Sequence, residues 1–158
     1  MERIMKFILV SIIILFMGCQ PPQRKNQSEV VHPLAGEWRN LTLKVEMDKQ
    51  HGEPTSIFDV NENTWEEQLQ IRPIKTYFRN DGTFNSEHFN LQDSLVLNPK
   101  GTWTSTDKEI TMITTDPFSD TTACSYTIKD NVVTFGCWVD WDEDGEKDDW
   151  YLGTQKKY

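Results

Sequence analysis

Residues 124–137 read Cys-Ser-Tyr-Thr-Ile-Lys-Asp-Asn-Val-Val-Thr-Phe-Gly-Cys, and this stretch decides the fold. Both halves are rich in residue types that favour a pleated strand, and the Asp-Asn pair between them suits a two-residue turn. Counting outward from that turn places Cys124 opposite Cys137. The stretch therefore predicts an antiparallel β-hairpin whose strands meet at a pair of cysteines.

The cysteine pair provides a test of this register. Opposed residues alternate between hydrogen-bonded and non-hydrogen-bonded positions, and the cysteines fall on the second kind, where Cα atoms lie about 4.5 Å apart. A disulfide accepts that separation, so we predict a bond between Cys124 and Cys137, with two reduced buried thiols as the alternative. The same register places one hairpin face in the core, namely Tyr126, Ile128, Val133 and Phe135.

Alternating apolar residues continue on both sides of the hairpin, from Leu34 to the C-terminus, and favour strands over helices. Turn signals such as Asp81-Gly82 recur at short intervals, which is typical of an antiparallel sandwich or barrel. Thr64 and Glu67 match a capping box, so we expect one short helix over 64–70, with an irregular loop as the alternative. The eight predicted strands cover about residues 37–46, 74–79, 83–89, 100–105, 109–115, 122–129, 132–141 and 148–156.

The first 19 residues have the organisation of an export signal. A basic start precedes an apolar run from Phe7 to Met17, and Gly18 then comes before Cys19. The run is shorter than the roughly 20 residues that span a bilayer. The cysteine makes this segment resemble a bacterial lipoprotein signal, which implies that Cys19 is lipidated and becomes the new N-terminus. A plain secretory signal or an uncleaved anchor is the alternative.

This organisation divides the chain into three parts: a signal peptide at 1–18, a flexible polar tether at 19–33, and one folded domain at 34–158. The whole chain has a net charge of −9, and without the signal peptide the net charge is −10. Such acidity argues against nucleic acid as a partner and against a polybasic membrane contact. We expect a lipoprotein anchored to a membrane of the bacterial cell envelope through its N-terminal lipid, on the periplasmic or outer-membrane face, where a disulfide persists.

Short motifs across the folded domain resemble those of bacterial lipocalin-like lipoproteins. Residues 34–38, Leu-Ala-Gly-Glu-Trp, resemble the Gly-x-Trp opening of lipocalins, and residues 78–84 resemble a Phe-x-x-Asp-Gly-Thr hairpin of those lipoproteins. Gly101-Thr102-Trp103 and Tyr126 before a turn are also similar. The resemblance implies an all-β fold, an eight-stranded antiparallel up-and-down barrel in which the tryptophan of the opening motif closes one end. Such a barrel either holds one small ligand or is filled by its own side chains.

Two functions follow from this resemblance. The first is the binding of a small apolar or amphipathic ligand inside the barrel, and the second is a filled barrel that acts as a non-enzymatic protein-interaction module of the envelope. No enzyme activity is predicted, because His32, His51 and His88 are isolated and no phosphate-binding glycine loop or serine elbow occurs. The residues expected to line a ligand site are Trp38, Phe78, Phe84, Trp103, Tyr126 and Phe135.

The acidic stretch before the last strand suggests calcium as a cofactor. Asp140, Asp142 and Asp144 alternate and precede a glycine, as carboxylates do in the first half of a calcium loop, and Asp148 stands at the ninth position. Tyr151 occupies the twelfth position, where an EF-hand has Glu, so the EF-hand form is not met. The alternative is a hairpin tip whose alternating carboxylates are simply solvated. In the interaction-module hypothesis, this hairpin is the calcium-stabilised surface.

Overall fold

The computed structural model describes residues 31–158. The signal peptide, Cys19 and residues 20–30 of the tether lie outside the described residues, so their roles stay predictions. Among the described residues, no helix has the length and apolar character needed to cross a membrane.

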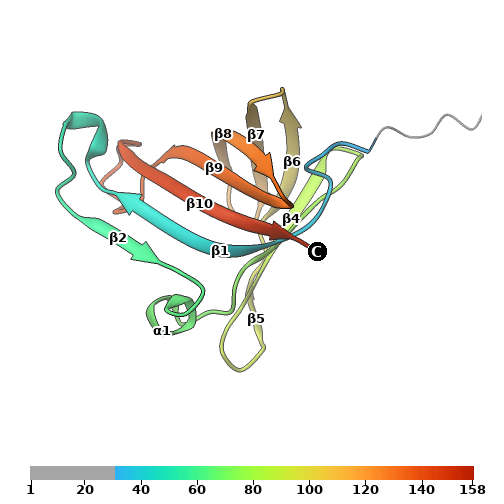
Figure 1. The fold of residues 1–158 in the computed structure, drawn as a ribbon, viewed down its shortest axis with the longest axis horizontal. Helices are drawn as coiled ribbons and strands as arrows, with labels where there is room; N and C mark the ends of the chain where they lie inside the picture. The colour runs from blue at the N-terminus through green and yellow to red at the C-terminus, as the bar shows by residue number, and fades with distance from the viewer. Residues whose placement is uncertain (1–30) are drawn as a thin grey trace, which may run out of the picture. The chain divides into compact units, whose positions relative to one another are not determined.

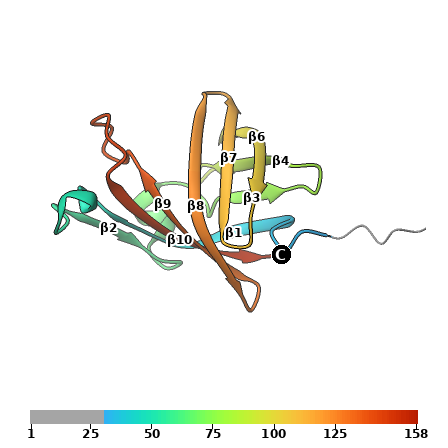
Figure 2. The ribbon, with the colours of Figure 1, turned by 90° about the horizontal axis from the view of Figure 1, so that it is seen from above.

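Eight strands form a closed antiparallel barrel, which confirms the predicted all-β architecture (Figures 1 and 2). Consecutive barrel strands pair with one another, and the last returns to pair with the first along the length of both, from Trp38 opposite Lys157 to Glu46 opposite Trp150. The barrel strands are β1 (Gly36–Glu46), β3 (Lys75–Phe78), β4 (Thr83–Phe89), β6 (Lys100–Ser105), β7 (Glu109–Asp116), β8 (Asp120–Lys129), β9 (Val132–Val139) and β10 (Asp149–Lys157).

Two further strands were not predicted, and both lie outside the barrel path. The strand β2 (Ile57–Val60) pairs with the second half of β1, and β5 (Leu95–Leu97) pairs with the end of β4. Each has only three or four residues, which is too short for an alternating pattern to stand out from a loop. A single 3-10 turn, η1 (Lys49–His51), lies between β1 and β2.

The predicted short helix is present as α1 (Trp65–Leu69), below β2 in Figure 1. The capping box does not form, because the Thr64 side chain makes no cap with the helix and instead accepts a hydrogen bond from the Asn61 N–H at 3.1 Å. Trp65 is buried with Leu43, Val45 and Val60 in a small apolar cluster between α1 and β1. Burial of this tryptophan, rather than capping, therefore holds the short helix in place.

The hairpin register is confirmed at each pair, including Cys124 opposite Cys137. The two cysteines form a disulfide, and their Cα atoms are 4.4 Å apart, close to the separation expected for a non-hydrogen-bonded pair. Ile128 is an exception to the predicted core face, since it is 36% exposed. Pairing of β8 with β7 ends at Ser125, so the tip of the hairpin extends beyond β7. Ile128 therefore has no β7 residue paired beside it.

Candidate functional site

The six aromatic residues predicted to line a ligand site form the packed core of the barrel. They are between 0% and 8% exposed and belong to one apolar cluster. Phe78 is central, with its ring 5.3 Å from that of Trp103 and 6.2 Å from that of Phe84. The indole N–H of Trp38 donates to the carbonyl of Leu34 at 2.6 Å. These side chains fill one half of the barrel, and of the six only Phe135 borders the cavity in the other half.

The filled end is also covered by residues from both ends of the described chain. His32 packs edge-on against Trp103 at 5.0 Å, and its Nε2 lies 2.8 Å from the hydroxyl of Ser105. Lys157 places its ammonium 5.3 Å from the Trp38 ring and donates to the carbonyl of Pro33 at 2.8 Å. His32 and Pro33, which the sequence assigned to the tether, thus contact the barrel and help to close this end.

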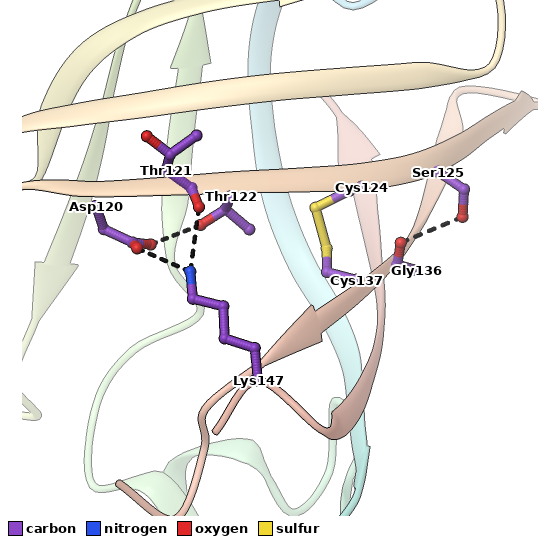
Figure 3. The surroundings of a disulfide bond; sticks show 8 residues. All are labelled: Asp120, Thr121, Thr122, Cys124, Ser125, Gly136, Cys137 and Lys147. Carbon is purple, nitrogen blue, oxygen red and sulfur yellow. Dashed lines mark hydrogen bonds and ion pairs between the residues drawn. A yellow bond between two sulfur atoms is a disulfide. The ribbon is translucent and has the colours of Figure 1, made fainter. Parts of the chain in front are cut away.

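A cavity of about 190 Å³ occupies the other half of the barrel, against β7, β8, β9 and β10. The disulfide forms part of its wall, and Figure 3 shows the bond joining β8 to β9. The lining is largely apolar and consists of Met112, Thr122, Cys124, Phe135, Cys137, Val139, Tyr151 and Gln155.

Two polar side chains in this lining set its chemistry. Gln155 is buried and donates through Nε2 to Asn40 Oδ1 at 3.2 Å, whereas its Oε1 is buried without a hydrogen-bond partner among residues 31–158. Burial raises the pKa of Tyr151 to about 12, against a hydrogen bond with Asn40 that lowers it. The tyrosine is therefore neutral at physiological pH, and the Gln155 amide adds a polar group to the largely apolar lining.

The loop between β9 and β10 is attached to β8 beside the cavity. The Lys147 ammonium donates to Asp120 Oδ1 at 2.9 Å and to the carbonyl of Thr121 at 3.1 Å, and Figure 3 shows its side chain extended toward both. The hydrogen bond from Lys147, followed by one from Thr122, lowers the pKa of Asp120. This ionic contact holds the loop over the start of β8.

The predicted metal ligands are only partly brought together. A carboxylate oxygen of Asp142 lies within 4.8 Å of one from Asp144 and one from Asp48, and an oxygen of Asp142 is likewise grouped with Asp140 and Asp149. Asp148 belongs to neither group. Its carboxylate lies instead with His51 and Glu146, and its Oδ2 is 2.8 Å from His51 Nε2.

Asp149 is the residue of this region that sequence reasoning missed, and it is fully buried. Its Oδ1 accepts from the Asp48 N–H at 2.9 Å, and its Oδ2 accepts from the N–H groups of Trp141 at 2.6 Å and Asp142 at 3.4 Å. These bonds also explain why β9 ends at Val139 and not at 141 as predicted, since the Trp141 N–H is turned toward Asp149. One carboxylate thus joins the turn after β1 to the loop after β9.

Comparison with protein-family models and with curated proteins found no match to this chain. The lipoprotein signal and the lipocalin-like motifs accordingly stay predictions from the sequence. The barrel, the disulfide and the cavity stand on the structure of residues 31–158.

Proposed function

We propose that this protein is a lipid-anchored barrel of the bacterial cell envelope that binds a small amphipathic molecule in the cavity beside the disulfide. The observation that carries the proposal is a largely apolar cavity lined in part by the Gln155 amide, whose Oε1 is solvent-inaccessible and has no hydrogen-bond partner among residues 31–158, so that a donor reaches it only when the amide turns toward the cavity. A buried acceptor without a partner costs on the order of 1–3 kcal/mol. A ligand that donates one hydrogen bond and fills the apolar space would recover that cost.

The size of the cavity limits the ligand. An apolar cavity of about 150 Å³ accommodates benzene, whereas pockets for drug-sized ligands occupy about 300–1,000 Å³. At about 190 Å³, this cavity suits a molecule with one ring and a hydroxyl or amine. A bulkier ligand would have to displace the aromatic side chains that fill the other half of the barrel, at the cost of their packing.

The lipid anchor is supported by the sequence around Cys19 and by two compatible features. A disulfide between Cys124 and Cys137 persists in an exported protein, and the net charge of −9 argues against a polybasic contact with a membrane. The test is intact-mass measurement of the full chain purified from bacterial membranes. We expect loss of residues 1–18 together with the added mass of a lipid, and we expect Cys19→Ser to release the protein from the membrane fraction. An unmodified mass with residues 1–18 retained would contradict the anchor.

Ligand binding is tested with two fluorinated probes of nearly equal size that differ in one donor. By ¹⁹F NMR titration, 4-fluorophenol should bind at least tenfold more tightly than fluorobenzene, which corresponds to about 1.4 kcal/mol for the hydrogen bond to Gln155. The variant Gln155→Leu should remove the preference while still binding fluorobenzene. Thr134→Val, whose side chain faces away from the cavity on β9, is the matched control and should keep it.

Two outcomes would contradict ligand binding. The first is that neither probe binds. The second is that the wild type and Gln155→Leu prefer 4-fluorophenol over fluorobenzene to the same extent. Native mass spectrometry of protein from its host distinguishes ligand binding from the alternative function, a protein-interaction module. A retained small molecule supports the ligand proposal, and a bare mass with a co-purifying protein supports an interaction module.

A further inference from the structure

A histidine and two carboxylates meet where the turn after β1 lies beside the loop that leads into β10 (Figure 1). His51 ends the 3-10 turn η1, and Glu146 and Asp148 belong to the loop after β9. One nitrogen or oxygen from each of the three lies within 4.8 Å of the other two. We propose that these three residues, here called the His51 group, bind one divalent transition-metal ion such as Zn²⁺. The inference is independent of the ligand proposed for the cavity.

The buried carboxylate of Asp148 is the observation that points to a cation in this group. Asp148 is 4% exposed, and its Oδ1 is solvent-inaccessible and has no hydrogen-bond partner among residues 31–158. Its Oδ2 lies 2.8 Å from His51 Nε2, so the carboxylate faces the other members of the group. A buried carboxylate that lacks donors is costly, and a cation bound to it would offset that cost.

The next residue along the chain shows how a buried carboxylate is satisfied without a cation. Asp149 accepts hydrogen bonds from three backbone N–H groups. Within the described part of the chain, the one ion-pair partner of Asp148 and of Glu146 is the exposed side chain of His51. An imidazole that binds a metal is neutral, so the two carboxylates together would balance the charge of one divalent ion.

The separations within the His51 group suit a small cation. Zinc binds histidine nitrogen and carboxylate oxygen at about 2.0–2.2 Å, so ligand atoms at two corners of a tetrahedron are about 3.3–3.6 Å apart. His51 Nε2 is 3.5 Å from Glu146 Oε2, which fits, and 2.8 Å from Asp148 Oδ2. Binding therefore requires the imidazole to move away from Asp148 by about 0.5 Å. The His51 and Glu146 side chains are 62% and 69% exposed, so both have room to adjust.

Backbone hydrogen bonds already hold the two segments together. The Gln50 N–H donates to the carbonyl of Asp148 at 3.1 Å, and the His51 N–H donates to the carbonyl of Asp48 at 3.0 Å. The backbone on both sides of the site is thus positioned without the ion, which lowers the entropy cost of binding. A bound metal would add a link between the turn after β1 and the loop after β9.

The ligand set favours a transition metal over calcium or magnesium. Imidazole nitrogen suits zinc, copper, iron and nickel, whereas calcium and magnesium take ligand sets made of oxygen. The neighbouring carboxylates of Asp142 and Asp144 belong to separate groups that contain no histidine. Three protein ligands would leave one position of a tetrahedral zinc ion open to water.

The proposal is tested by calorimetric titration and thermal unfolding of the full chain, purified without a polyhistidine tag and stripped of metal with a chelator. We expect one Zn²⁺ to bind per chain and to raise the Tm, with a smaller effect of Ca²⁺ at the same concentration. His51→Gln and Glu146→Gln should each weaken zinc binding by about tenfold or more and keep the fold, because both side chains are exposed. Glu143→Gln, an exposed residue of the same loop outside the three groups, is the matched control and should bind like the wild type.

A second measurement locates the ion. Zinc should shift the imidazole signals of His51 in NMR spectra of ¹⁵N-labelled protein and leave those of His88 on β4 unchanged. Asp148→Asn should also weaken zinc binding, although it removes a buried charge and need not lower the Tm of the metal-free protein.

Three results would overturn the proposal. The first is that the wild type binds no zinc, and the second is that the wild type and His51→Gln bind zinc equally well. The third is that zinc binding is lost in Asp142→Asn and retained in His51→Gln, which would place the ion among the neighbouring carboxylates instead.

Discussion

The disulfide and the Asp149 carboxylate lie near each other on the paired strands β9 and β10, and they hold the structure together by different chemistry. Cys137 lies opposite Tyr151 on β10, and two residues further along β9 Val139 lies opposite Asp149. The disulfide joins β8 to β9 within an apolar wall, whereas Asp149 joins two loops through three backbone N–H groups. The first link lies within one hairpin and was predictable from it. The second depends on loops that are about 100 residues apart in the sequence.

The largest loss of stability is expected from removing the Asp149 carboxylate. Asp149→Ala leaves the N–H groups of Asp48, Trp141 and Asp142 without their acceptor in partly buried positions. At about 1–3 kcal/mol for each unpaired buried donor, we expect a loss of roughly 3–5 kcal/mol in the free energy of unfolding. Urea denaturation in calcium-free buffer measures it, with Asp107→Ala as an exposed control that should change stability by less than about 0.5 kcal/mol. A loss below about 1 kcal/mol for Asp149→Ala would show that water replaces the carboxylate.

Removing the disulfide should lower the free energy of unfolding by a somewhat smaller amount. The bond between Cys124 and Cys137 closes a short loop, so the chain-entropy model gives a contribution of about 3 kcal/mol. The double variant Cys124→Ala/Cys137→Ala should lose this amount in urea denaturation. Wild-type protein treated with reductant should match the double variant, while Ser125→Ala on the outer face of the same hairpin should resemble the oxidised wild type. Equal stability of oxidised and reduced protein would contradict the expectation.

The contrast between the two links shows what the sequence can predict in this molecule. Side chains alternate along a strand, so one turn determined the partner of Cys124 and the inward direction of Tyr126, Val133 and Phe135. The same reasoning failed for Ile128, because it does not specify where the neighbouring strand ends. All eight barrel strands carried this alternation, and the two short strands that were missed did not.

The candidate sites were less predictable, since they depend on contacts between distant segments. Alternation identified Asp140, Asp142 and Asp144, but nothing near them indicates that Asp48 joins the group. A carboxylate directly before the apolar run of β10 was the available signal for Asp149. The aromatic residues were correctly expected to face the interior, but whether they line a space or fill it depends on their mutual packing. Gln155, a polar side chain on the inward-facing side of β10, was the available signal for the cavity.

Tyr151, which lies between the disulfide and Asp149, allows the stability of this region to be tested as a function of pH. Tyr151 has a pKa of about 12 in the folded protein, whereas an unfolded tyrosine titrates near its ordinary value of 10.0. The contribution of neutral Tyr151 is therefore fully present below pH 10 and is lost as the pH rises toward 12, because the unfolded chain releases its proton first. By pH 11 the resulting loss in the free energy of unfolding is about 1.4 kcal/mol. Urea denaturation from pH 8 to 11 should show a steeper fall for wild type than for Tyr151→Phe, and parallel curves would contradict the buried, neutral hydroxyl.

The smallest effect is expected at the third attachment of this region, the Lys147–Asp120 contact. Its side chains are 50% and 40% exposed, and exposed ion pairs contribute about 0.2–1 kcal/mol. Because Lys147 lowers the pKa of Asp120, the contribution is present above the ordinary value of 3.8 and is lost as the pH falls below it. Lys147→Met and Asp120→Asn, combined in a double-mutant cycle at pH 7, should give a coupling below about 1 kcal/mol that decreases at high salt. A coupling above about 2 kcal/mol would mean that this surface contact, and not the buried Asp149 carboxylate, holds the loop after β9 on the barrel.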